Sequence, residues 1–88
     1  MIPIEFEMVI FRENKTYVSY SPDLDVSSCG DTVEEARKNL KTAVRLFLEE
    51  AEKLGTLNDI LVEAGFKVDA SGKWNPPKMV SVESVELA

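Results

Sequence analysis

The sequence of 88 residues contains no histidine and a single cysteine, Cys29. Histidine is the side chain that most often serves as a catalytic base or metal ligand near neutral pH. One cysteine cannot form an intrachain disulfide or a cysteine-rich zinc site, and no histidine is present to activate Cys29 as a nucleophile. These absences exclude the commonest hydrolytic and zinc-dependent mechanisms, and we expect neither catalysis nor a cofactor.

Long apolar runs and an excess of positive charge are also missing. No stretch approaches the roughly 18–20 apolar residues that a membrane span needs, and the first residues lack a signal-peptide pattern. We therefore expect a cytoplasmic protein without membrane contacts. The net charge of −6 argues against direct nucleic-acid binding by this chain alone. An acidic surface favours a basic protein partner, but the same charge would also keep a small protein soluble.

The stretch from Gly30 to Gly55 predicts one long amphipathic helix. Asp31 or Thr32 can cap its start, and Thr32 with Glu35 forms a capping box, while the last glycine suits the helix end. Apolar residues at steps of three and four predict one buried stripe, formed by Val33, Ala36, Leu40, Ala43, Val44, Phe47, Ala51 and Leu54. Leu46 lies outside this stripe, which indicates a second contact.

The residues before this helix predict three strands. Apolar and polar residues alternate from Ile2 to Phe11, which is typical of a half-buried strand. Val9 and Phe11 interrupt its polar side, so we expect the second face to be partly covered there. A polar turn connects this strand to Thr16–Tyr20 in a hairpin, and Val26–Cys29 predicts a short third strand.

The residues after Gly55 predict a short second helix, an extended segment, a turn and a last strand. Leu57 to Ala64 form the helix, with Thr56 as its N-cap, and Met79–Leu87 forms the strand. In that strand Val80 and Val82 share one face whereas Val85 and Leu87 share the other. The strand therefore carries a bulge or contacts two different neighbours.

The element order predicts an α+β fold. We expect a three-stranded antiparallel sheet followed by a long helix packed on it, a short second helix and a returning C-terminal strand. Residues 1–88 form one domain, with a core over 2–66 and an extension over 67–88 that serves oligomerisation. A chain this small gains stability by self-association, so we expect a homodimer or homotetramer. Candidate interface residues are Leu46, Trp74, Val85 and Leu87, and Trp74 can alternatively cap the core.

Acidic residues around one loop raise the question of a metal site. Asp23, Asp25 and Asp31 lie close in sequence, and Asp23 and Asp25 are candidate ligands for a divalent cation in a metal-dependent nuclease. Turn formation by Asp23 and Asp25 and helix capping by Asp31 explain the same residues. A further alternative is a stand-alone oligomerisation or ligand-binding module.

A tyrosine-led strand and a Pro-acidic-Leu loop at Tyr17–Leu24 precede a Gly-Asp-Thr-x-Glu-Glu-Ala stretch at Gly30–Ala36 and then Asn39, Ala43 and Leu48. In this arrangement the chain resembles the HicB family of antitoxins over residues 5–55. The motif residues are Gly30, Asp31, Thr32, Glu35 and Ala36. A departure occurs at positions 25 and 26, Asp-Val here, where many members carry Pro-Gly.

The resemblance implies a partial ribonuclease-H-like domain without nuclease activity. Such a domain binds and neutralises a small basic HicA-type toxin that cleaves RNA. Many members add a C-terminal DNA-binding module, whereas the residues after Phe66 predict only a turn and a strand. We therefore expect no separate DNA-binding domain.

Overall fold

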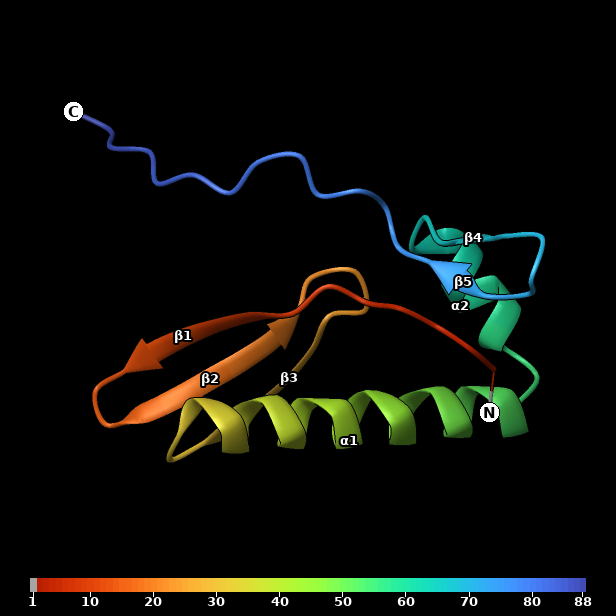
Figure 1. Cartoon of the computed structure of the whole chain (residues 1–88), viewed down its shortest axis with the longest axis horizontal. Coiled ribbons are helices and arrows are strands. Elements are labelled where there is room, and N and C mark those ends of the chain that lie inside the picture. Colours follow the sequence, from red (N-terminus) through yellow and green to blue (C-terminus); the bar gives the residue numbers. More distant parts are fainter. Residues whose placement is uncertain (1) are drawn as a thin grey trace.

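The chain forms an α+β structure in which a long helix lies against a three-stranded antiparallel sheet (Figure 1). The computed structural model describes residues 2–88. The sheet contains β1 (Val9–Glu13), β2 (Thr16–Ser21) and β3 (Val26–Gly30), in the order β1-β2-β3. This arrangement confirms the predicted fold class and the three-strand sheet.

The first strand begins later than the sequence predicts. Val9 pairs with Tyr20 and Glu13 with Thr16, and Asn14 in the connecting turn has a positive φ of 56°. Residues 2–8 do not join this sheet, and Ile4 instead forms an isolated parallel bridge with Trp74. The alternating apolar side chains of this segment still pack against the core, namely Ile2, Ile4, Phe6 and Met8. Alternation therefore predicted the buried side of the segment but not its pairing.

Helix α1 (Val33–Lys53) has the predicted boundaries. Thr32 is its N-cap, and Gly55 has a positive φ of 73° just after its end, as a helix-closing glycine requires. The fully buried face is rotated from the predicted stripe and consists of Ala36, Leu40, Val44, Leu48 and Ala51. Phe47 and Leu54, predicted to be buried, are 36% and 68% exposed.

Helix α2 (Leu57–Glu63) completes the core at the far end of α1. Leu57 and Leu61 are buried and join a cluster with Leu24, Leu40, Val44, Leu48, Ala51 and Phe66. Thr56 occupies the N-cap position as predicted, but its hydroxyl does not cap α2. The hydroxyl instead donates to the carbonyl oxygen of Ala51 at 3.3 Å.

A second, two-stranded sheet pairs β4 (Lys67–Val68) with β5 (Trp74–Asn75). Asp69 organises the turn between them. Its carboxylate accepts hydrogen bonds from the Ser71 hydroxyl at 2.6 Å and the Asn75 amide at 3.0 Å, and also from the backbone of Ser71 and Lys73. The main chain of Trp74 exchanges hydrogen bonds with Pro3 and Glu5, so this turn holds the N-terminal segment in place.

The predicted C-terminal strand Met79–Leu87 is wrong for the single chain. Residues 76–88 have no strand pairing, and the end of this segment runs as an extended chain beside the sheet, on the side opposite α1 (Figure 1). A strand requires a neighbouring edge to satisfy its backbone groups, and residues 78–88 meet none within this chain. The returning strand of the predicted fold is therefore absent from the described residues.

Within residues 2–88, no helix has the length and apolar character needed to cross a membrane.

Candidate functional site

The motif residues at the start of α1 serve the packing of the helix on the sheet. The Thr32 hydroxyl accepts a hydrogen bond from the Glu35 backbone N–H at 3.0 Å. A Cβ at Gly30 would lie 2.6 Å from the backbone nitrogen of Ala36, so only glycine lets strand and helix approach this closely. Ala36 is fully buried, while Asp31 is exposed. The motif is thus explained by helix capping and close packing.

Two side-chain hydrogen bonds fasten the first turns of α1 to the sheet. The buried Ser19 hydroxyl donates to the carbonyl oxygen of Ala36 at 2.7 Å, and the Asn39 amide donates to the carbonyl oxygen of Cys29 at 2.8 Å. Nothing in the sequence analysis singled out Ser19. The signal that could have found it is a small residue between two large ones, Val18 and Tyr20, in the same strand.

The acidic loop does not assemble a metal site from the residues named in the sequence analysis. Asp25 has a positive φ of 55°, and its carboxylate accepts a hydrogen bond from the Tyr20 hydroxyl at 2.9 Å. This hydrogen bond raises the pKa of Tyr20 above its usual value. Asp23 is half-buried, with one carboxylate oxygen left without a partner. Over residues 2–88, no three acidic or cysteine side chains converge as a cation site would require.

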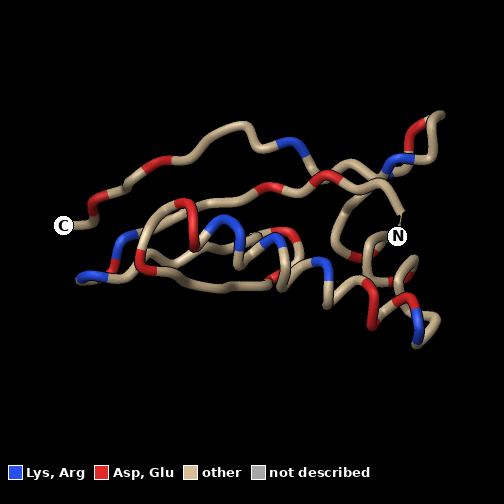
Figure 2. Tube along the Cα trace, turned by 60° about the horizontal axis from the view of Figure 1, so that its bottom comes forward, with Lys and Arg blue, Asp and Glu red and all other residues tan. Residues whose placement is uncertain are grey.

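Charge is distributed unevenly along the helices (Figure 2). Residues 37–45 of α1 carry four basic residues and no acidic one, namely Arg37, Lys38, Lys41 and Arg45. Between Leu46 and Ala64 the acidic residues are Glu49, Glu50, Glu52, Asp59 and Glu63, and the only basic one is Lys53. Among the described residues the one ion pair within α1 joins Arg37 to Glu34. The acidic half of α1 and α2 therefore has carboxylates available to a partner.

Exposed apolar side chains lie beside these carboxylates. Leu46, Phe47 and Leu54 are 57%, 36% and 68% exposed. At about 100° per residue, Phe47 and Leu54 lie at one side of the buried face of α1, and Leu46 lies further round toward solvent. Glu50 lies between Leu46 and the pair Phe47 and Leu54, and Glu49 lies on the other side of Leu46. We call this surface, formed by Leu46, Phe47, Leu54, Glu49 and Glu50, the acidic helix surface. It combines apolar anchors with negative charge.

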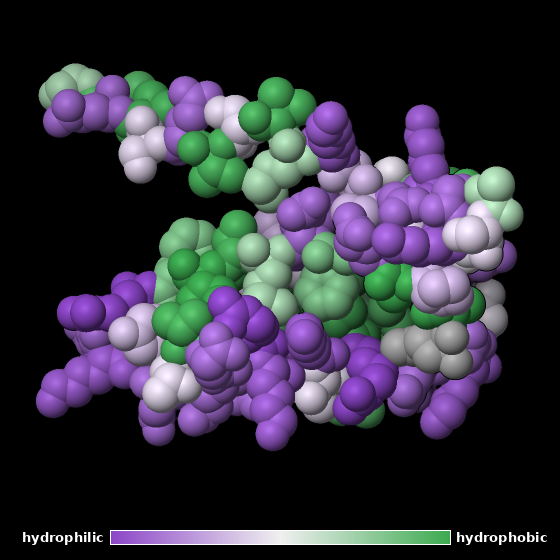
Figure 3. Space-filling view, in the orientation of Figure 1, coloured by the Kyte–Doolittle hydropathy of each residue, from purple (hydrophilic) through white to green (hydrophobic). Residues whose placement is uncertain are grey.

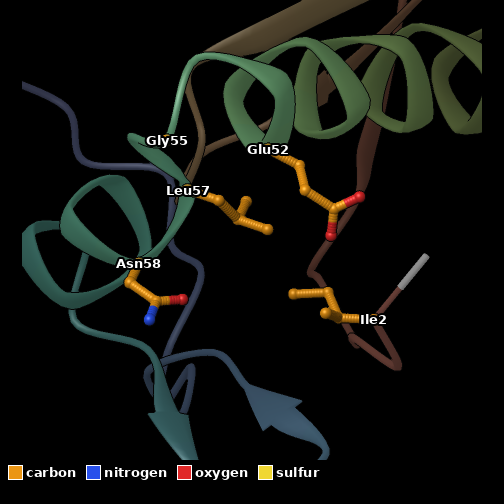
Figure 4. Close-up of a pocket in the computed structure, with 5 residues that line it drawn as sticks. All are labelled: Ile2, Glu52, Gly55, Leu57 and Asn58. Atoms are coloured by element: carbon orange, nitrogen blue, oxygen red, sulfur yellow. The ribbon is translucent and has the colours of Figure 1, made fainter.

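A shallow pocket of about 260 Å³ lies where α1 meets α2. Figure 4 shows Glu52, Leu57 and Ile2 directed toward a common space between the end of α1, the start of α2 and the N-terminal segment. Ligand sites usually have volumes of roughly 300–1,000 Å³ and bury most of the ligand. The pocket is smaller than this range and open to solvent. It therefore suits the rim of a protein–protein contact better than the binding of a small ligand.

The other candidate interface residues occupy different environments. Trp74 is half-buried and packs against the core. This agrees with the expectation that Trp74 caps the core, which was the alternative to a place at an interface. Val85 and Leu87 are 76% and 88% exposed in the C-terminal segment (Figure 3). Leu46 and the C-terminal segment belong to different parts of the molecule, so the structure does not bring the four residues into one site.

Comparison of the chain with protein-family models, with curated proteins and with solved structures finds no match. The resemblance to HicB antitoxins consequently rests on the motif residues alone.

Proposed function

We propose that this chain is a non-enzymatic binding module of the HicB antitoxin type. It neutralises a small basic RNA-cleaving toxin by direct protein–protein contact. The observation that carries this proposal is the acidic helix surface, where exposed apolar side chains adjoin carboxylates that have no ion-pair partner among the described residues. Carboxylates of this kind suit the lysine and arginine side chains of an RNA-binding toxin, which must be basic to hold phosphate.

The physical roles of the two kinds of side chain differ. Leu46, Phe47 and Leu54 supply apolar area at the centre of the contact, where most binding free energy arises. Glu49 and Glu50 speed association and select a basic partner. Occupying the basic groups of the toxin would prevent their contact with RNA phosphates, so inhibition needs no catalytic group on this chain.

The test is a calorimetric titration of the full chain with the small basic protein encoded beside its gene. We expect one partner per chain and an affinity that falls as salt concentration rises, because screening weakens charge attraction. Joint substitution Glu49→Lys and Glu50→Lys should weaken binding at least about tenfold, which corresponds to about 1.4 kcal/mol.

Joint substitution Lys38→Glu and Lys41→Glu is the matched control, because it changes as many charges in the basic half of the same helix. These changes should leave binding intact or strengthen it. Absence of binding, together with undiminished RNA cleavage by the neighbouring protein, would refute the antitoxin role.

A further inference from the structure

Apolar side chains lie on both faces of the sheet. Ser19 contacts α1, so residues of the same parity in β2 and their partners in β1 and β3 face the helix, among them Ile10 and Val26. The opposite side carries Val9 and Phe11 of β1, Val18 and Tyr20 of β2, and Cys29 of β3. We call this side the outer sheet face.

Neither helix found in residues 2–88 covers the outer sheet face. Phe11 is 56% exposed and Cys29 is also exposed, while Val9, Val18 and Tyr20 are only half-buried. The sequence predicted a partial cover at Val9 and Phe11, because they interrupt the polar side of their strand. In the single chain that cover is missing.

The C-terminal segment 78–88, here called the tail, is the second unpartnered apolar surface. Val80, Val82, Val85 and Leu87 are each 75–90% exposed. Its one described side-chain hydrogen bond joins Ser81 to Glu83, and none of those found in residues 2–88 ties it to the rest of the molecule. Figure 3 shows the tail separated from the sheet side of the molecule by an open slot.

The start of the tail is fixed by proline. Pro76 and Pro77 restrict the backbone, and the Pro77 ring lies so close to Gly65 that a Cβ there would be 3.0 Å from its Cγ. The tail is thereby directed outward as an extended segment alongside the sheet (Figure 1). An exposed apolar strand of this kind templates pairing with another chain.

We propose that two copies of this chain exchange tails, each tail lying across the outer sheet face of the other copy. One chain carries both halves of the contact, the apolar tail and the uncovered apolar face, so a two-fold axis satisfies both at once. The exchange places the C-terminal strand that the sequence predicts on the partner copy instead of on its own sheet.

Size agrees with this arrangement. Residues 78–88 plus the outer sheet face approach the roughly 20–30 residues per side of a standard interface.

The slipped alternation of the tail also fits. A bulge near Glu83 and Ser84 rotates the second half of a strand, so Val80 and Val82 can face the same sheet as Val85 and Leu87. A straight strand would leave one pair in water.

The experiment is light scattering on the full chain across a range of concentrations. We expect twice the chain mass of 9.8 kDa for the unmodified protein. Joint substitution Val82→Glu and Val85→Glu in the tail, and separately Phe11→Glu on the sheet, should each shift the protein to the monomer. Val62→Glu is the matched control, because Val62 is an apolar residue of α2 with 64% exposure outside both surfaces, and it should leave the dimer intact.

Circular dichroism checks that each variant keeps its helix content, so loss of the dimer is not loss of the fold. A monomer at every concentration for the unmodified chain would overturn the proposal, as would a dimer that resists both the tail and the Phe11 substitutions. Oxidation of a Val85→Cys variant distinguishes a tail on the partner's sheet from a tail folded back on its own sheet, because the native Cys29 lies on the outer sheet face. A disulfide that joins the introduced cysteine of a tagged copy to Cys29 of an untagged copy, identified by peptide mapping, supports exchange, whereas the same disulfide within one chain refutes it.

Discussion

Ser19 and Ser21 are both fully buried on the helix side of β2, but their hydroxyl groups have different surroundings. Ser19 donates to the Ala36 carbonyl, whereas the Ser21 hydroxyl has no hydrogen-bond partner among the described residues. Small residues are required at both positions because the helix lies directly above them. The hydroxyl itself matters only where it is paired.

This difference makes a matched pair of substitutions informative. Ser19→Ala should lower the free energy of unfolding by about 1 kcal/mol, because a buried hydrogen bond is lost. Ser21→Ala should be neutral or slightly stabilising, because it removes a buried hydroxyl that is not hydrogen-bonded. Urea denaturation of the two variants provides the measurement, and equal destabilisation by both would contradict the role assigned to Ser19.

At the scale of single elements, the sequence predicts structure best where the cause is local. Thr32 and Gly55 delimit α1 because capping and a positive φ depend on nearby residues only. The rotation of its buried face was not predictable in this way. Leu48 is buried and Leu54 exposed because of where the sheet and α2 lie, and those positions are set by contacts far apart in sequence.

The β4–β5 turn offers a test at the same scale. Hydrogen bonds from the Ser71 hydroxyl and the Asn75 amide, with weaker contributions from backbone N–H groups, lower the pKa of Asp69 from 3.8 to about 2. A carboxyl group whose pKa falls on folding stabilises the turn fully above the unfolded value. That stabilisation is lost as the pH falls through the folded value.

We therefore expect the amide signals of Ser71 and Lys73 to stay constant down to about pH 4 and to shift as the pH falls toward the folded pKa of about 2. Nuclear magnetic resonance across this range is the measurement. Asp69→Asn, which cannot titrate, is the control and should abolish the shift. A midpoint near pH 4 in the unmodified chain would show that the hydrogen bonds do not act as described.

For the whole molecule, the sequence predicts the α+β class and the order of elements through β3, α1 and α2. It predicts a strand at Met79–Leu87 that the single chain does not form. The alternation of that segment predicts pairing with a neighbouring strand, but it does not identify the chain to which that strand belongs. The same limit applies to candidate sites, since Leu46, Val85 and Leu87 are recognisable as exposed apolar residues but their partners are not.

The two proposals assign different surfaces to different partners. The acidic helix surface lies on α1, and α1 covers the opposite side of the sheet from the outer sheet face. A second copy on one side therefore leaves the other side free for a basic partner. Leu46, expected from the sequence at a contact between copies, lies on the acidic helix surface and is assigned to the basic partner.

Native mass spectrometry of the full chain, alone and mixed with the basic protein encoded beside it, tests this account most directly. The account predicts a dimer of the free chain and, in the mixture, a complex of two chains with two partners. A free chain at its monomer mass of 9.8 kDa would contradict tail exchange. A dimer that takes up no partner would contradict the antitoxin function and leave tail exchange standing.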